Sequence, residues 1–175
     1  MKMTSLFKMS MLAAGMFAAL GANAADGTIN VNGNIVAAGC VVEGAETVNE
    51  VNFGTLSPQN FTAVGTISDK KDVSFVLKDC PASLTSAKLV FMGRNDTTNT
   101  QLVQIYDTSK AKGIGIALYK KDGGMIPMHT TSEPFPINAE TGTAAIALQA
   151  AVMSTSEVVS GGDFTAVAFF TMSYN

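Results

Sequence analysis

Residues 28–36 read TINVNGNIV, in which apolar side chains alternate with polar ones. This period of two is typical of a β-strand that buries one face. The stretch lies near the start of the chain, where residues stay loose unless a sheet or a helix holds them. We therefore expect residues 28–36 to form a strand that joins a sheet of another molecule.

The composition indicates a single folded domain. Of the 175 residues, 47% are hydrophobic and 14% are charged, with a net charge of -3. These values argue against a disordered chain and against a nucleic-acid-binding protein. Sixteen glycines, five prolines and many short runs of Val, Ile, Phe and Thr favour an all-β sandwich.

Residues 1–24 have the pattern of a secretory signal peptide. Lys2 and Lys8 precede the apolar run 9–20, and Ala22 and Ala24 are the small residues expected before a cleavage site. The run is too short for a membrane-spanning helix, which needs about 20 apolar residues. We expect an exported protein whose mature chain begins at Ala25.

The two cysteines, Cys40 and Cys80, are predicted to form a structural disulfide bond. Thiols that reach an oxidising compartment tend to be joined. A metal-binding or nucleophilic pair is the alternative, but neither CxxC spacing nor neighbouring histidines support it.

Period-two patterns and turn residues predict about eight strands. They are expected at 40–42, 47–54, 72–80, 87–93, 114–119, 125–128, 144–150 and 164–174. Residues 144–153 also suit a helix, but their neighbours all favour strands. Asp122-Gly123 predicts a hairpin turn. Eight strands fit a Greek-key sandwich.

No motif predicts an enzyme, a cofactor or a metal site. Gly113 and Gly115 resemble the start of a dinucleotide-binding loop, but position 118 is Leu and no helix pattern follows, so we interpret them as glycines in a crowded strand. His129 is the only histidine and has no nucleophile motif beside it. It is expected in a solvated loop.

Residues 164–174 form the last predicted strand. Six residues face one way: Phe164, Ala166, Ala168, Phe170, Met172 and Tyr174. The strand ends at Asn175, so no later segment is expected to cover its free side. An exposed apolar edge of this kind is a template for pairing with another chain.

Taken together, these features resemble the chaperone–usher pilins, the subunits of type 1 and related fimbriae of Gram-negative bacteria. The resemblance covers the whole mature chain and rests on five stretches. They are residues 27–36 running into Ala38-Gly39-Cys40, Phe53-Gly54-Thr55-Leu56, Leu77-Lys78-Asp79-Cys80, residues 113–118 with Asp122-Gly123, and the ending Phe170-Thr171-Met172-Ser173-Tyr174-Asn175.

The resemblance implies an immunoglobulin-like sandwich that lacks its C-terminal strand and is completed by a donor strand from another subunit. Ile29, Val31, Gly33 and Ile35 would form the inserting face of the donor strand. The six residues listed for the last strand would line the acceptor groove and bind the chaperone. The chain would divide into a signal peptide (1–24), a donor extension (25–38) and a pilin domain (39–175).

The implied partners are a periplasmic chaperone, an outer-membrane usher and other fimbrial subunits in a head-to-tail polymer. The protein would pass through the periplasm to a fimbrium on the cell surface and support adhesion, without binding nucleic acid. Its length fits a shaft or adapter subunit rather than a two-domain tip adhesin. The alternatives are a secreted carbohydrate-binding sandwich that acts as a monomer, or an enzyme.

Overall fold

The computed structural model describes residues 39–43, 50–121 and 123–175. The predicted donor strand, with Ile29, Val31, Gly33 and Ile35, lies outside these residues, as does the predicted signal peptide. In the described ranges no helix is long and apolar enough to cross a membrane. The regular elements are β1 (Val41–Val42), the 3₁₀ helix η1 (Pro58–Asn60), β2 (Lys71–Lys78), β3 (Ser86–Met92), β4 (Val103–Gln104), β5 (Ile114–Lys120), β6 (Phe135–Pro136), β7 (Ala144–Ser154) and β8 (Phe169–Tyr174).

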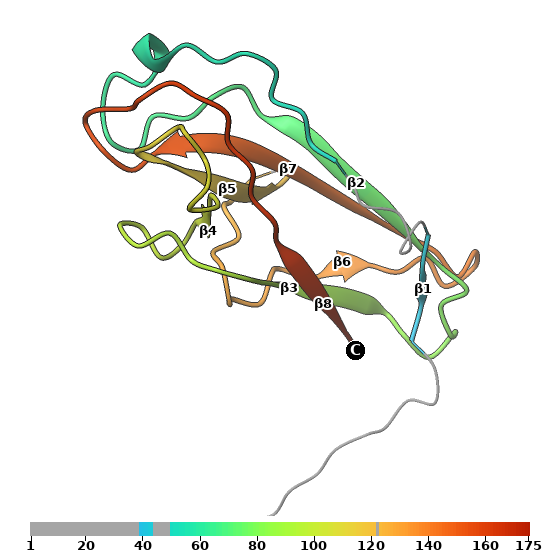
Figure 1. Ribbon diagram of the computed structural model, residues 1–175. Helices are drawn as coiled ribbons and strands as arrows, with labels where there is room; N and C mark the ends of the chain where they lie inside the picture. The colour runs from blue at the N-terminus through green and yellow to red at the C-terminus, as the bar shows by residue number, and fades with distance from the viewer. Residues whose placement is uncertain (1–38, 44–49, 122) are drawn as a thin grey trace, which may run out of the picture. The chain divides into compact units, whose positions relative to one another are not determined.

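These strands form two antiparallel sheets, as the all-β prediction requires (Figure 1). The larger sheet has the order β1-β2-β7-β5-β4, and the smaller has the order β6-β3-β8. Their inner faces enclose one hydrophobic core. β1 and β8 are therefore edge strands of different sheets.

β2 and β7 supply the centre of the larger sheet. Phe75 lies opposite Ile146, and Leu77 lies opposite Ala144. All four side chains are buried, while alternate residues of β2 such as Ser74 are exposed. The predicted inward face of residues 72–80 is thus confirmed. β7 confirms the strand assignment of residues 144–150, because its apolar side chains follow a period of two.

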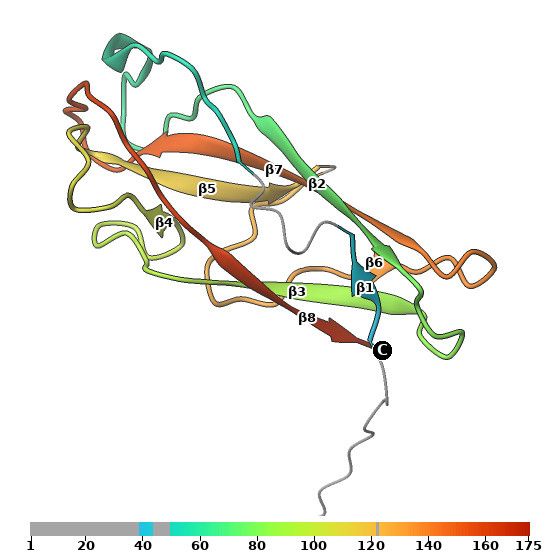
Figure 2. The same cartoon turned by 45° about the vertical axis from the view of Figure 1, so that its right-hand side comes forward.

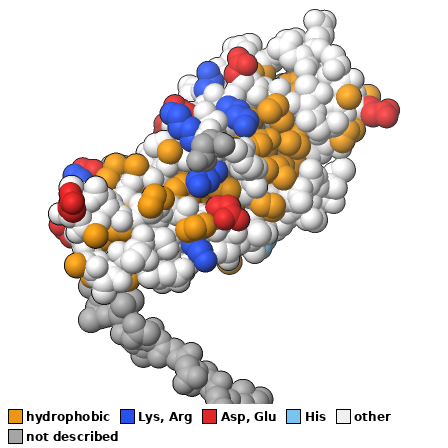
Figure 3. Space-filling model, turned by 180° about the vertical axis from the view of Figure 1, so that it is seen from behind, with side chains coloured by type: hydrophobic (Ala, Val, Ile, Leu, Met, Phe, Trp, Pro, Cys, Tyr) orange, Lys and Arg blue, Asp and Glu red, His pale blue; other side chains and the backbone are white. Residues whose placement is uncertain are grey.

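β5 is buried on both faces. Ile116 and Leu118 face the main core, whereas Ala117 and Tyr119 belong to a second apolar cluster that also contains Leu102. Figure 3 views the molecule from behind and shows hydrophobic side chains gathered beside several Lys or Arg side chains. Lys70 places its ammonium 3.9 Å from the centre of the Tyr119 ring. A strand covered on both faces needs small residues where neighbours come close.

The two glycines at the start of β5 meet this need. Gly115 lies in a crowded position, because a Cβ there would lie 3.1 Å from the Leu102 side chain. Gly113 has φ 76, and a Cβ there would lie 2.6 Å from the Val158 carbonyl oxygen. The interpretation of these residues as glycines in a crowded strand is confirmed.

Gly113→Ala is expected to lower the free energy of unfolding by about 1–3 kcal/mol, since it combines a strained φ with a backbone clash. Gly123→Ala is the matched control, because nothing lies within 4 Å of its Cβ position. Urea denaturation followed by circular dichroism measures both variants. Equal midpoints for the two variants would contradict the explanation.

Three strand predictions need correction. The predicted strand 47–54 is absent over its described part, residues 50–54, because no described segment pairs with them, and residues 47–49 lie outside the described residues. The turn after β5 is present, with Lys120 N–H donating to Gly124 O, but 125–128 makes only one bridge, Tyr119 to Met125. Pro127 has no N–H to continue that ladder, and β4 occupies the same edge of β5 further along.

The third correction concerns the last strand, which begins at Phe169 instead of Phe164. Upstream of it, Ile105 bridges Ala166, and Tyr106 N–H donates to Thr165 O at 2.7 Å. Residues 163–166 therefore contact the segment that follows β4, at the edge of the larger sheet. The C-terminal segment crosses from one sheet to the other, and this crossing closes one side of the sandwich.

Candidate functional site

The C-terminal segment keeps a strict alternation of burial over residues 164–174. The structure places all six predicted lining side chains, Phe164, Ala166, Ala168, Phe170, Met172 and Tyr174, on the core side, where each is partly buried and packed against the core. The residues between them are exposed. In an ordinary core strand these six side chains would be fully buried, whereas here each of them stays partly exposed.

β8 uses only one of its two backbone edges among the described residues. Ser86 and Asn175 exchange both N–H···O bonds, at 3.0 and 3.2 Å. In an antiparallel ladder such pairs alternate, so Ser173 and Thr171 also bond to β3. Phe170, Met172 and Tyr174 consequently direct their N–H and C=O groups to the free edge of β8.

A second apolar row faces this edge. Val51, Phe53 and Leu56 are partly buried and pack against the same core, while Asn52 and Gly54 are exposed. The rings of Phe53 and Phe164 lie 6.2 Å apart. We call the two rows, Val51, Phe53 and Leu56 with the six residues of the C-terminal segment, the open seam.

The floor of the open seam includes Phe75 of β2. Its ring stacks on Phe170 with the ring centres 4.7 Å apart. Figure 2 shows β8 running across the sandwich toward β1 at the C-terminal end of the chain. The seam thus extends from the Phe53–Phe164 contact to the end where β1 begins.

The predicted disulfide bond lies at this second end. Cys40 and Cys80 are joined, with their Cα atoms 4.2 Å apart, which confirms the pairing inferred from export and cysteine count. Because Cys40 precedes β1 and Cys80 follows β2, the bond ties the two strands together. It also fixes the point where the chain enters the domain.

Tyr174 covers that entry point. Its ring lies so close to Gly39 that a Cβ on Gly39 would be 2.8 Å from Cε2 of the ring. Burial raises the pKa of Tyr174, and a hydrogen bond with the Cys40 backbone acts in the opposite direction. The hydroxyl therefore stays neutral at physiological pH and the ring packs as an apolar group.

The other residues considered from the sequence lie away from the open seam. His129 is exposed in a turn after Met128, and its Nε2 lies 2.7 Å from Asn95 Oδ1. No described group of three His, Cys, Asp or Glu side chains is arranged to hold a metal ion. The chemistry available at the seam is strand pairing and apolar contact.

The role of Val51, Phe53 and Leu56 was not predicted from the sequence. The alternation of Val51 and Phe53 predicts an ordinary paired strand over 47–54, which leaves out Leu56, and nothing in that pattern says whether a partner is present. The useful signal was that this segment follows the first cysteine, which the disulfide bond ties to the end of β2 in the larger sheet.

The model of a protein family described as fimbrial protein matches residues 29–175. The chain belongs to the fimbrial protein family. The match includes the segment 29–36 together with the whole described domain. This protein is accordingly a structural subunit of a bacterial fimbria.

Two curated relatives resemble the fimbrial subunit over nearly its full length. S-fimbrial protein subunit SfaG of Escherichia coli (strain 536 / UPEC) is 30% identical over 164 residues, covering 94% of this chain and 92% of the relative. Long polar fimbria protein A of Salmonella typhimurium is 31% identical over 171 residues, covering 97% and 95% of the two chains.

Solved structures show the same fold for the fimbrial subunit. The P pilus rod subunit PapA matches with a TM-score of 0.67 and 20% identity, over 79% of this chain and 100% of PapA. A type I fimbria protein and antigen of Burkholderia pseudomallei matches with a TM-score of 0.62 and 26% identity, over 78% and 90% of the chains. The fold is an immunoglobulin-like β-sandwich.

Proposed function

We propose that this fimbrial subunit polymerises by donor-strand complementation, in which residues 28–36 of one copy fill the open seam of another. The free edge of β8 is the observation that carries the proposal. There Phe170, Met172 and Tyr174 direct backbone groups that pair with no other described residue to the free edge, and their partly buried side chains lie beside that edge on the core side. A strand added at this edge gains a hydrogen-bonded ladder and apolar contacts together.

The segment 28–36 has the pattern that such an edge requires. Ile29, Val31, Gly33 and Ile35 share one face of an extended strand, and the residues between them are polar. Burial of the three branched side chains would contribute on the order of 5 kcal/mol. Gly33 would meet a shallow position of the seam.

Because donor and acceptor surfaces differ, the contact is head-to-tail and builds an open filament. In this proposal residues 1–24 are a signal peptide, 25–38 the donor extension and 39–175 the pilin domain. A periplasmic chaperone covers the seam during export, and an outer-membrane usher receives the subunit. The assembled fimbrium on the cell surface supports adhesion.

Gly33→Val in the donor segment tests the proposed register. We expect a synthetic peptide of residues 25–38 with this change to bind the mature chain about 5- to 150-fold more weakly, since overpacking costs about 1–3 kcal/mol. A one-residue slip cannot relieve the clash without turning Ile29, Val31 and Ile35 outward. Fluorescence anisotropy of labelled peptides gives the dissociation constants.

Asn32→Val is the matched control, because position 32 faces away from the seam in this register. Its peptide should bind within about threefold of the wild-type peptide, well inside the 1–3 kcal/mol that separates the Gly33 variant. If the Asn32 variant bound more weakly than the Gly33 variant, the inserting face would be assigned wrongly. If no peptide bound, donor-strand complementation itself would be rejected.

A further inference from the structure

Four large apolar side chains are exposed together on the outer side of the C-terminal segment. Met92, Tyr106, Val167 and Phe169 have exposed fractions of 41%, 42%, 39% and 66%. Met92 and Phe169 lie directly opposite each other in the β3–β8 ladder. Tyr106 is joined to the same segment through its N–H, which donates to Thr165 O. We call these four residues the outer cluster.

The outer cluster borders a pocket of about 260 Å³, whose lining is mostly apolar. Three of its members, Tyr106, Val167 and Phe169, line this pocket, and Gly93 forms part of its wall. Gly93 has φ 144, and a Cβ there would lie 3.3 Å from Val167 O. The crossing segment is thus held close against the end of β3, which shapes the pocket.

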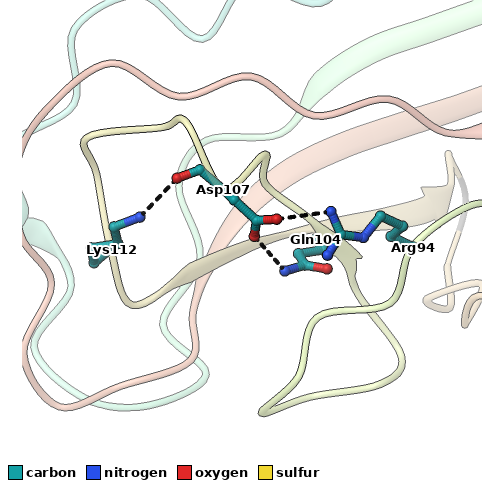
Figure 4. A network of polar contacts seen from close by, with 4 residues as sticks. All are labelled: Arg94, Gln104, Asp107 and Lys112. Carbon is teal, nitrogen blue, oxygen red and sulfur yellow. Dashed lines mark hydrogen bonds and ion pairs between the residues drawn. The ribbon is translucent and has the colours of Figure 1, made fainter.

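A polar network fixes the loop that carries Tyr106 (Figure 4). The Asp107 carboxylate accepts hydrogen bonds from Arg94 at 3.0 Å and from Gln104 at 3.3 Å. Lys112 donates to the Asp107 carbonyl oxygen at 3.5 Å. The outer cluster therefore has a defined shape and a polar rim, the arrangement of a protein–protein contact surface.

The direction of the donor strand decides which molecule lies beside this surface. Every ladder in both sheets is antiparallel. A donor strand antiparallel to β8 runs toward Phe164, so the donor's Val36 lies at the end of the seam near residues 163–168. β8 offers the donor strand a longer backbone edge than residues 50–56 do. We therefore orient the donor strand antiparallel to β8 and not to residues 50–56.

The linker that follows the donor strand is too short to let the donor's domain move away. Only Ala37 and Ala38 separate Val36 from Gly39, where the domain begins. Three residue steps span at most about 11 Å. The donor's domain must therefore lie against the acceptor at the end of the seam, where Val167 and Phe169 are exposed.

We propose that the outer cluster is the docking surface for the domain of the donor copy, a second molecule of this chain. This inference rests on the proposed function and adds a contact between domains to the contact made by the donor strand. The polar network beside the cluster carries Arg94 and Lys112 with Asp107, one positive charge in excess. The donor's end near its disulfide bond presents Asp79 and Glu140, which complement that charge.

The double substitution Tyr106→Ser/Phe169→Ser tests this surface with two readouts. The first is binding of the 25–38 peptide to the mature chain, which requires only the seam. The second is assembly of full mature chains, followed by light scattering and electron microscopy. We expect peptide binding within about twofold of wild type and assembly at least about tenfold slower, because aromatic residues carry much of the energy of protein contacts.

Thr171→Ser is the matched control, since Thr171 is exposed on the same face of β8 but lies outside the cluster. It should leave both readouts unchanged. Normal assembly by the double variant would overturn the inference, and so would equal losses of peptide binding and assembly, because the residues would then belong to the seam. Failure of the wild-type chain to bind the peptide would instead reject the proposed function.

Discussion

Met172→Asp is expected to weaken binding of the donor peptide by at least about a hundredfold and to stop polymerisation. Met172 lies in the middle of the free edge of β8, with its side chain partly buried against the core. A donor strand would cover this position. An unpaired carboxylate removed from water costs several kcal/mol, and each 1.4 kcal/mol weakens binding about tenfold.

Thr171→Asp introduces the same charge one residue earlier, on the exposed face of the same strand. The affinity of this variant for the 25–38 peptide should stay within about threefold of the wild-type affinity, because the added carboxylate stays in water. Peptide titration of both variants, with circular dichroism to check their folding, gives the comparison. Equal losses in the two variants would mean that net charge, and not the seam, controls binding.

Removal of the disulfide bond is the second change with a large expected effect. The Cys40→Ser/Cys80→Ser variant should lose about 4 kcal/mol of stability, because the bond closes a loop whose ends are 40 residues apart. Small domains have only about 5–15 kcal/mol of stability in total. Urea denaturation of the mature chain, with and without the donor peptide, measures the loss.

Wild-type chain reduced with dithiothreitol is the control for the serine substitutions, since it lacks the bond but keeps both sulfur atoms. Its denaturation midpoint should match that of the double variant. A variant as stable as the oxidised wild type would show that the cross-link contributes nothing to the fold.

The strands that could be predicted are those whose side chains alternate over six or more residues. β2, β3 and β7 were found this way, because one face of each packs on the core and imposes a period of two. β5 is buried on both faces, and it was predicted from a short apolar run that ends before the turn at Asp122-Gly123. β4 and β6 were missed, since two residues carry no period. Pro136 in β6 even argues against a strand, and only its position at a sheet edge allows it.

The inward face of the candidate site was predictable for the same reason. All six residues from Phe164 to Tyr174 lie on the core side, although only three of them belong to β8. What the sequence could not indicate is the pairing of each residue. Residues 163–166 bond to the segment after β4, and Val51 and Phe53 have an alternating pattern without a described ladder partner. Pairing depends on contacts between distant parts of the chain.

The closeness of Gly39, Tyr174 and the disulfide bond has a mechanical consequence for a fibre under tension. In the proposed polymer the pull of one neighbour reaches the domain at Gly39, and one residue later a covalent bond passes it to the end of β2. Residues 41–79 therefore cannot be unravelled by that force. The other neighbour pulls its strand lengthwise along β8, so the ladder is loaded in shear, and its hydrogen bonds must break together instead of one after another.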